Sequence, residues 1–283
     1  MLSEKLGGEQ YVALLSKGFK RKSKGFVWVE TGGDWREFGD EPALLKSLNP
    51  KNPIAVCENR LQGVARIKSS NPLVKVVVLD DGLQHRNLIP HKSLVILDSN
   101  RPLKEEALLP SGSLRDLRGR LKKFDACIIS RASEPSDFEL EKQGASDIIK
   151  SVFLSQMIDG TPTHILEKNS EKPRILAISG IAEPERFMDG LAKSWSVVRR
   201  ETYADHHEYS EKDIQGWLTS VRNEKLDAIV TTSKDAVRIR PLIEKYPEIL
   251  LVSICIEVEW RESDAIEAWV DEWLQSPIFA PHK

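Results

Sequence analysis

A run of apolar residues that ends abruptly in two carboxylates constrains this chain more than any other stretch. Residues 74–79 read Val-Lys-Val-Val-Val-Leu, and Asp80, Asp81 and Gly82 follow directly. A run this short and rich in valine predicts a buried strand of a parallel sheet. In open α/β sheets, ligands bind just beyond the carboxyl ends of the strands. The two aspartates are therefore expected at a binding edge.

Adjacent carboxylates at such an edge can hold Mg²⁺, a hard cation that prefers oxygen ligands. Gln84, His85 and Arg86 come next and add polar and cationic groups. A strand followed by Asp-Asp-Gly is also an ordinary turn signal, and in that interpretation the aspartates bind nothing. The stretch alone leaves both interpretations open.

Similar short apolar runs recur along the chain and alternate with helical or loop segments. We expect further strands at 11–16, 26–29, 54–57, 94–98, 125–131, 175–178, 195–199, 228–232 and 249–256. This alternation predicts an α/β fold with two α/β/α domains and mostly parallel sheets. The regularity drops between about residues 133 and 172. We therefore expect a core domain at 1–150, an extended linker at 151–172 and a smaller Rossmann-like domain at 173–283.

Composition excludes several classes of protein. The 283 residues are 40% hydrophobic, enough for a sizeable core, and the net charge of −2 does not indicate a nucleic-acid binder. Cys57, Cys127 and Cys255 are far apart and odd in number, which predicts buried reduced thiols with no disulfide framework or zinc site. No apolar run is long enough to span a membrane, which leaves peripheral attachment open.

Three further segments can carry chemistry or be ordinary structure. The basic segment 17–25 contains Lys17, Lys20 and Arg21 and is either a solvated loop or a contact for phosphates or an anionic membrane. Asp40 reads as a helix N-cap. Asp205-His206-His207 offers metal ligands or a general base, or is simply a polar loop before a helix capped by Ser210.

Lys234 follows another strand end, in Thr232-Ser233-Lys234-Asp235. It can contact a phosphate, or it can cap the next helix or pair with Asp235. The sequence does not distinguish these roles.

Six motifs, taken in order, resemble one enzyme family, the tetraacyldisaccharide 4′-kinases of lipid A biosynthesis. They are Gly39-Asp40-Glu41-Pro42, Asp80-Asp81-Gly82-Leu83-Gln84-His85, Leu109-Pro110-Ser111-Gly112-Ser113-Leu114-Arg115-Asp116, Ser179-Gly180-Ile181-Ala182-Glu183-Pro184, Asp205-His206-His207 and Thr232-Ser233-Lys234-Asp235-Ala236-Val237. The resemblance implies ATP- and Mg²⁺-dependent phosphorylation of the 4′-hydroxyl of a lipid-linked glucosamine disaccharide. It also implies a P-loop-kinase-like first domain and a peripheral enzyme at the cytoplasmic face of the inner membrane, with no protein partner.

The resemblance also implies roles for individual residues. Asp80, Asp81 and Asp116 match the acidic metal site, Asp40 the catalytic base and His206, rather than His207, its assisting histidine. Lys234 and Gln84 are expected near ATP. The acceptor is expected to contact the following residues: Ser16, Lys17, Lys20, Arg21, His85 and Arg115.

The chain departs from the family pattern in several places. Lys17, Phe19, Leu83 and Asp116 replace a usual Arg, Tyr, Phe and Glu, and no Gly-x-x-x-x-Gly-Lys-Ser/Thr motif occurs. The family's P-loop would precede Met1, because 1–6 resembles the end of the helix that follows it. We therefore expect little 4′-kinase activity from residues 1–283 alone. The alternatives are an inactive relative that binds a lipid A precursor or a partner, and an unrelated Mg²⁺-dependent hydrolase.

Overall fold

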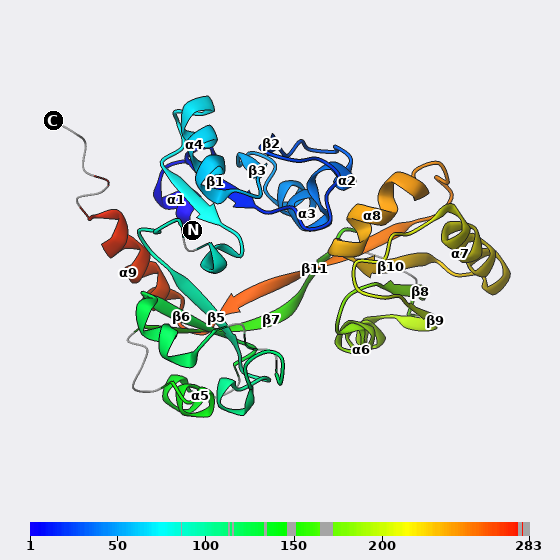
Figure 1. Cartoon of the computed structure of the whole chain (residues 1–283). Helices are drawn as coiled ribbons and strands as arrows, with labels where there is room; N and C mark the ends of the chain where they lie inside the picture. The colour runs from blue at the N-terminus through cyan, green and yellow to red at the C-terminus, as the bar shows by residue number, and fades with distance from the viewer. Residues whose placement is uncertain are drawn as a thin grey trace. The chain divides into compact units, whose positions relative to one another are not determined.

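The computed structural model of the chain describes residues 1–85, 87–112, 114, 116–132, 135–145, 151–164, 172–276 and 279. Within these residues, strands form two sheets in which most neighbours run parallel, and helices connect them (Figure 1). The prediction of an α/β fold with mostly parallel sheets is therefore confirmed.

The first sheet has four described strands in the order β2-β3-β1-β4. Its strands are β1 (Val12–Ser16), β2 (Val27–Trp28), β3 (Ile54–Val56) and β4 (Val76–Leu79). β1 runs parallel to both β3 and β4, whereas the short β2 is antiparallel to β3. The predicted strand before Asp80 is thus β4, and its carboxyl end leads directly into the two aspartates.

The second sheet has seven described strands in the order β5-β6-β7-β11-β10-β8-β9. They are β5 (Leu94–Asp98), β6 (Ala126–Ser130), β7 (Val152–Pro162), β8 (Arg174–Ser179), β9 (Ser196–Thr202), β10 (Ala228–Thr232) and β11 (Leu251–Trp260). β5 and β6 were expected in the same domain as β1 to β4, but they belong to this second sheet. The predicted linker contains a long strand, β7, which pairs with β6.

Helices lie between the strands along the described part of the chain. They are α1 (Leu2–Lys5), α2 (Trp35–Phe38), α3 (Asp40–Leu48), α4 (Arg60–Ser70), α5 (Ser136–Gln143), α6 (Pro184–Ser194), α7 (Glu211–Glu224), α8 (Ser233–Ile243) and α9 (Ser263–Leu274). Short 3₁₀ turns occur at η1 (Glu9–Tyr11), η2 (Gly82–Gln84), η3 (Leu103–Glu105) and η4 (Arg118–Lys123). Ser210 caps α7 in a full capping box with Asp213, as the sequence indicates.

The chain divides into two compact units, each built from separate stretches of sequence. The first unit combines 1–9, 81–158 and 257–283, and the second combines 10–80 and 159–256. The domain limits predicted at 150 and 172 are continuous in sequence and remain a prediction.

Apolar clusters hold each unit together. In the second unit, Leu176, Ile229 and Trp217 pack between the sheet and α7 and α8, while Ala13, Leu15 and Ile67 fill the space beneath α4. Cys57, Cys127 and Cys255 form no disulfide; Cys57 and Cys127 are buried as predicted, whereas Cys255 is only half-buried. Burial raises the pKa of the Cys127 thiol to about 12. No described helix combines the length and apolar character needed to cross a bilayer.

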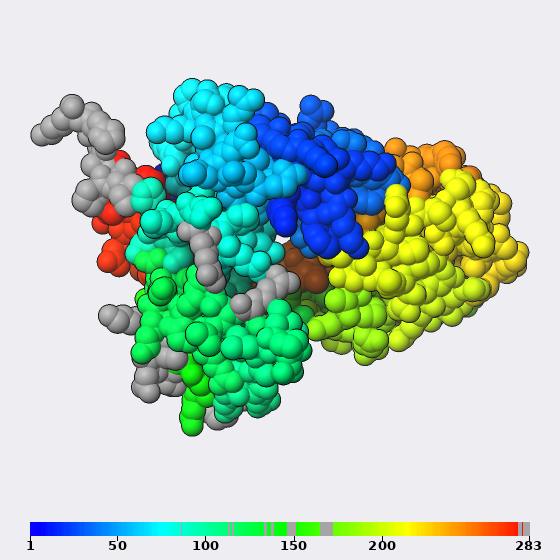
Figure 2. All heavy atoms as spheres, in the orientation of Figure 1, coloured from blue at the N-terminus to red at the C-terminus, as the bar shows by residue number. Residues whose placement is uncertain are grey.

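The second unit brings two distant segments into contact. α3 packs against α8, and in the space-filling view the blue atoms of the early segment lie directly against the yellow atoms near residue 205 (Figure 2). The ion pair between Arg36 and Glu208, 2.9 Å long, bridges the same two segments. The start of α3 therefore lies beside the loop that precedes α7.

Candidate active site

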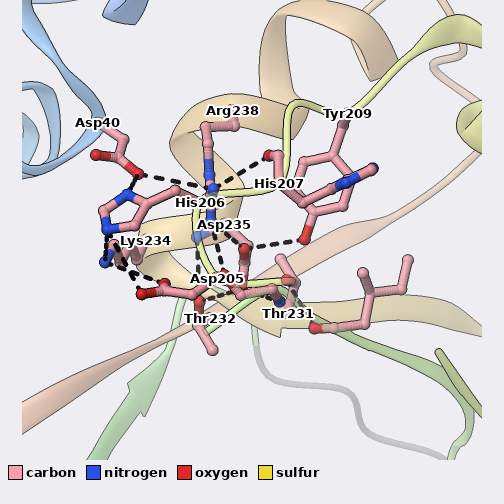
Figure 3. Close-up of polar contacts among 12 residues, drawn as sticks. Asp40, Asp205, His206, His207, Tyr209, Thr231, Thr232, Lys234, Asp235 and Arg238 are labelled. Carbon is pink, nitrogen blue, oxygen red and sulfur yellow. Dashed lines mark hydrogen bonds and ion pairs between the residues drawn. The ribbon is translucent and has the colours of Figure 1, made fainter. Parts of the chain in front are cut away.

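An aspartate and a histidine 166 positions apart form a largely buried pair in the second unit (Figure 3). Asp40 Oδ2 lies 2.8 Å from His206 Nδ1, and the two side chains are only 6% and 16% exposed. Asp40 is the first residue of α3, and Gly39 stands at the N-cap, so the predicted capping role of Asp40 is wrong. The aspartate instead orients the imidazole, as carboxylates do beside histidines that transfer protons.

The backbone around this pair is unusual. Gly39 has φ 95°, and a Cβ there would lie 3.1 Å from the carbonyl oxygen of Phe19. His206 has φ 59°, in the left-handed region that is uncommon for a residue other than glycine. Its N–H donates to the carbonyl of Gly180. Strain of this kind persists where surrounding contacts impose it, and it is concentrated at functional sites.

A fully buried arginine lies behind the pair. Arg238 Nη1 is 3.7 Å from Asp40 Oδ2 and donates to the carbonyl of His207, while Nη2 donates to Asp235 and to the carbonyl of Gly180. The side chains of Arg238 and Asp235 are both 0% exposed. This positive charge stabilises the negative charge on both carboxylates in a place that water does not reach.

Asp235, the carboxylate that pairs with this arginine, is itself held in place by further hydrogen bonds. It accepts from the Thr232 hydroxyl, the N–H of Gly180 and the Tyr209 hydroxyl, at 2.7, 3.0 and 2.9 Å. Burial, followed by the charge of Asp235, raises the pKa of Tyr209 well above its ordinary value. The tyrosine therefore remains a hydrogen-bond donor at physiological pH. The cluster fixes the start of α8 against the loop that carries His206.

Lys234 approaches the pair from the other side. Its Nζ lies 3.3 Å from His206 Nε2, 3.1 Å from Glu41 Oε1 and 3.6 Å from Asp205 Oδ1. The Lys234 side chain is 22% exposed. The sequence left open whether Lys234 pairs with Asp235, but Asp235 pairs with Arg238 one helical turn further along α8.

The second histidine of the motif has a different environment. The His207 ring stacks on Tyr203, with centroids 4.6 Å apart, and Nε2 lies 3.6 Å from Asp213 Oδ2. The ring is thus part of an aromatic cluster on the α7 side. This geometry supports His206 as the functional histidine.

The acidic strand end is more open. The Ser16 hydroxyl donates to Asp80 Oδ2 at 2.9 Å, and the buried Arg60 donates to the main-chain carbonyl of Asp80. Asp81 is exposed and adopts a left-handed conformation with φ 49°. Among the described residues, no three His, Cys, Asp or Glu side chains gather into a metal cluster. Hydroxyl and carboxylate oxygens are nevertheless the donors that Mg²⁺ prefers, and water or phosphate oxygens commonly complete its shell.

In the basic loop, two of the side chains predicted to bind the acceptor are exposed to solvent, and a third is buried in an ion pair within the protein. Lys17 and Lys20 are exposed. The Arg21 side chain is only 2% exposed and pairs with Glu58 at 2.7 Å, so its guanidinium holds the loop in place. Phe19, 55% exposed, directs its ring edge toward His206 with centroids 5.5 Å apart. The loop therefore borders the Asp40–His206 pair.

The remaining predicted residues lie in the first unit. Gln84 is exposed at the end of η2, His85 is half-buried, and Asp116 forms an ion pair with Arg120. Arg115 and Arg86 lie outside the described residues. Their roles remain predictions.

Sequence reasoning missed Arg238, Tyr209 and the buried role of Asp235. A signal was present, because Asp235 and Arg238 are three positions apart just after a strand end, on one face of the next helix. The pattern does not reveal burial, however, and only burial distinguishes this pair from a surface ion pair.

Comparison with known proteins shows what the chain is similar to. A tetraacyldisaccharide 4′-kinase of Porphyromonas gingivalis is 29% identical over 251 residues, covering 84% of this chain and 70% of the relative. The corresponding enzyme of Parabacteroides distasonis is 29% identical over 285 residues, covering 92% of this chain and 77% of its own length.

A solved structure supports the fold. The "apo" form of LpxK from Aquifex aeolicus in complex with ATP superposes with a TM-score of 0.70 at 23% identity, covering 95% of this chain and 80% of that one. The family model described as "Tetraacyldisaccharide-1-P 4'-kinase" matches residues 1–275. The chain therefore belongs to the tetraacyldisaccharide-1-P 4′-kinase family.

Proposed function

We propose that this protein transfers the γ-phosphate of ATP to the 4′-hydroxyl of a tetraacyl glucosamine disaccharide. The observation that carries the proposal is the buried contact of 2.8 Å between Asp40 and His206, within a chain of this kinase family. A hydroxyl is a weak nucleophile, and a positioned base that removes its proton typically contributes about 10²- to 10⁴-fold to the rate.

The proposed reaction breaks two bonds and forms two. The acceptor O–H bond breaks and its proton moves to the Asp40–His206 pair while the hydroxyl oxygen forms a bond to the γ-phosphorus. The bond between that phosphorus and the bridging oxygen breaks, and its electron pair leaves with ADP. Arg238, 3.7 Å from Asp40, places a buried positive charge beside this carboxylate.

Asp80, with Ser16 beside it, and Asp81 offer the oxygen donors that would hold Mg²⁺, together with Asp116. When bound, the ion neutralises charge on the β- and γ-phosphates. Gln84 is the proposed ATP contact, and Lys234, which the sequence also predicts there, lies 3.3 Å from His206 Nε2. The predicted acceptor contacts are Lys17 and Lys20, which are exposed on the basic loop, and Ser16, Arg21, His85 and Arg115.

We propose a peripheral location at the cytoplasmic face of the inner membrane, because the acceptor carries four acyl chains. The exposed lysines of the basic loop are suited to an anionic surface.

A phosphate-transfer assay tests the function. Protein that carries residues 1–283 within its natural open reading frame is incubated with labelled ATP, Mg²⁺ and the tetraacyldisaccharide 1-phosphate in detergent micelles. Label at the 4′-position that disappears in Asp40→Ala supports the proposal. Absence of transfer from the wild-type protein, or label at another hydroxyl, contradicts it.

A further inference from the structure

The contacts of His206 constrain where its protons lie. Nδ1 faces the carboxylate of Asp40 at 2.8 Å, and Nε2 faces the ammonium of Lys234 at 3.3 Å (Figure 3). An ionised carboxylate only accepts hydrogen bonds, and an ammonium only donates them. Both contacts are satisfied together by a single form, the neutral imidazole with its proton on Nδ1.

The other charges around the ring do not change this result. Asp205 Oδ2 lies 3.6 Å from Nε2, beyond hydrogen-bond distance, and its other oxygen is 3.6 Å from the same lysine. Glu41 holds the ammonium in place from α3 at 3.1 Å. A proton on Nε2 would face the N–H groups of Lys234 at close range, which is unfavourable.

We infer that Lys234 is a positioning residue that keeps Nε2 of His206 unprotonated, so that the imidazole stays neutral, donates from Nδ1 to Asp40 and leaves the carboxylate as the proton acceptor of the pair. Arg238 and Lys234 lie four positions apart on α8 and act on opposite ends of the pair, the first at the carboxylate and the second at the imidazole. This inference deepens the proposed function and rests on it for its catalytic consequence. It replaces the phosphate contact predicted for Lys234 from the sequence.

Removing the lysine charge has a defined consequence. In Lys234→Met, Asp40 and Asp205 would remain beside the ring with no ammonium to oppose a proton on Nε2. A proton on Nε2 is then no longer opposed by a neighbouring positive charge, and a charged ring beside Asp40 makes the carboxylate a weaker proton acceptor. Turnover should fall about tenfold at pH 7 and recover at higher pH, with the KM for ATP unchanged, because one charge removed from a general-base site acts on proton transfer.

A direct measurement uses ¹⁵N NMR of protein labelled in its six histidines, with His206→Gln identifying the His206 signals. Wild type should show a protonated Nδ1 and an unprotonated Nε2 at pH 7. Lys234→Met should convert Nε2 to the protonated form, and Lys234→Arg should retain the wild-type pattern. Lys245→Met removes an exposed lysine paired with Glu211, just after α8, and serves as the matched control.

The outcomes separate the two proposals. An unprotonated Nε2 in Lys234→Met overturns the inference, and so does a raised KM for ATP with unchanged turnover, which would indicate a phosphate contact. If Lys234→Met is unfolded, Lys234→Gln provides the same charge removal with a polar side chain. Wild-type protein that lacks transferase activity but shows the expected nitrogen pattern would contradict the proposed function and leave the charge arrangement confirmed.

Discussion

The pair of Asp40 with His206 and the acidic end of β4 differ in how many of their contacts the protein itself supplies. Asp40 is buried, hydrogen-bonded to His206 and flanked by Arg238. Asp80 is half-buried at the end of β4 and accepts a hydrogen bond from Ser16, and the next residue, Asp81, is exposed. Proton transfer requires a donor and an acceptor that are already held in position. A bound magnesium ion, in contrast, attracts its oxygen ligands and holds them in place by its own charge. The difference therefore matches the different chemistry proposed for the two sites.

The largest effect on turnover is expected at the pair of Asp40 with His206. Asp40→Ala and His206→Ala should each lower turnover by about 10²-fold or more, because each removes part of one base. The double variant should be little worse than the worse single variant, since residues that act as a unit are not additive. Steady-state kinetics of the three proteins measure this, and losses that multiply would show that the two residues act separately.

The open site should respond through the metal. Asp81→Asn should remove most activity and raise the Mg²⁺ concentration needed for half-maximal rate, because an amide binds the ion less well than a carboxylate. Asparagine tolerates the left-handed backbone at this position, so the melting temperature should change little. Unchanged turnover with an unchanged Mg²⁺ requirement would remove Asp81 from the site.

The buried arginine behind Asp40 should affect the free energy of unfolding much more than an exposed arginine does. Arg238→Met should destabilise the protein by about 3–5 kcal/mol, because it leaves Asp235 and Asp40 buried without their cation. The matched control is Arg222→Met, whose exposed pair with Glu248 should contribute no more than about 1 kcal/mol. Urea unfolding of both variants provides the comparison. Equal effects would show that the buried arginine is dispensable.

The smallest effect is expected at the basic loop. Burial opposes ionisation of Glu58, but hydrogen bonds from Arg21 and the N–H of Gly25 outweigh it and lower the pKa of this carboxyl. When folding lowers the pKa of a carboxyl, its ionised form stabilises the folded protein at pH values above the unfolded-state pKa. This stabilisation is lost as the pH falls through the folded-state pKa. Glu58→Gln should cost under about 1 kcal/mol at pH 7 and nothing at strongly acidic pH.

Thermal unfolding of Glu58→Gln and wild type, measured from pH 7 down to strongly acidic pH, tests whether the stability difference between them shrinks toward acid. A difference that grows toward acid would contradict it.

Much of this architecture can be predicted from the sequence, because a β-branched run before Asp80 and a polar turn before α7 carry local signals. The pairing of Asp40 with His206 came from resemblance to a family. The partnership of Arg238 with both Asp40 and Asp235 could not be predicted, because burial depends on how distant segments pack. The placement of β5 and β6 in the second sheet escaped prediction for the same reason, since periodicity identifies a strand but not its neighbours.

The separation of Asp40 and His206 by 166 positions has a consequence for synthesis of the protein. At translation rates of about 5–20 residues per second, the ribosome needs roughly ten to thirty seconds between the two residues. During that interval α3 has emerged without α8, and its first carboxylate lacks both histidine and arginine. Asp40 therefore stays hydrated on the nascent chain, and its carboxylate is desolvated only after His206 and Arg238 have been synthesised to pair with it.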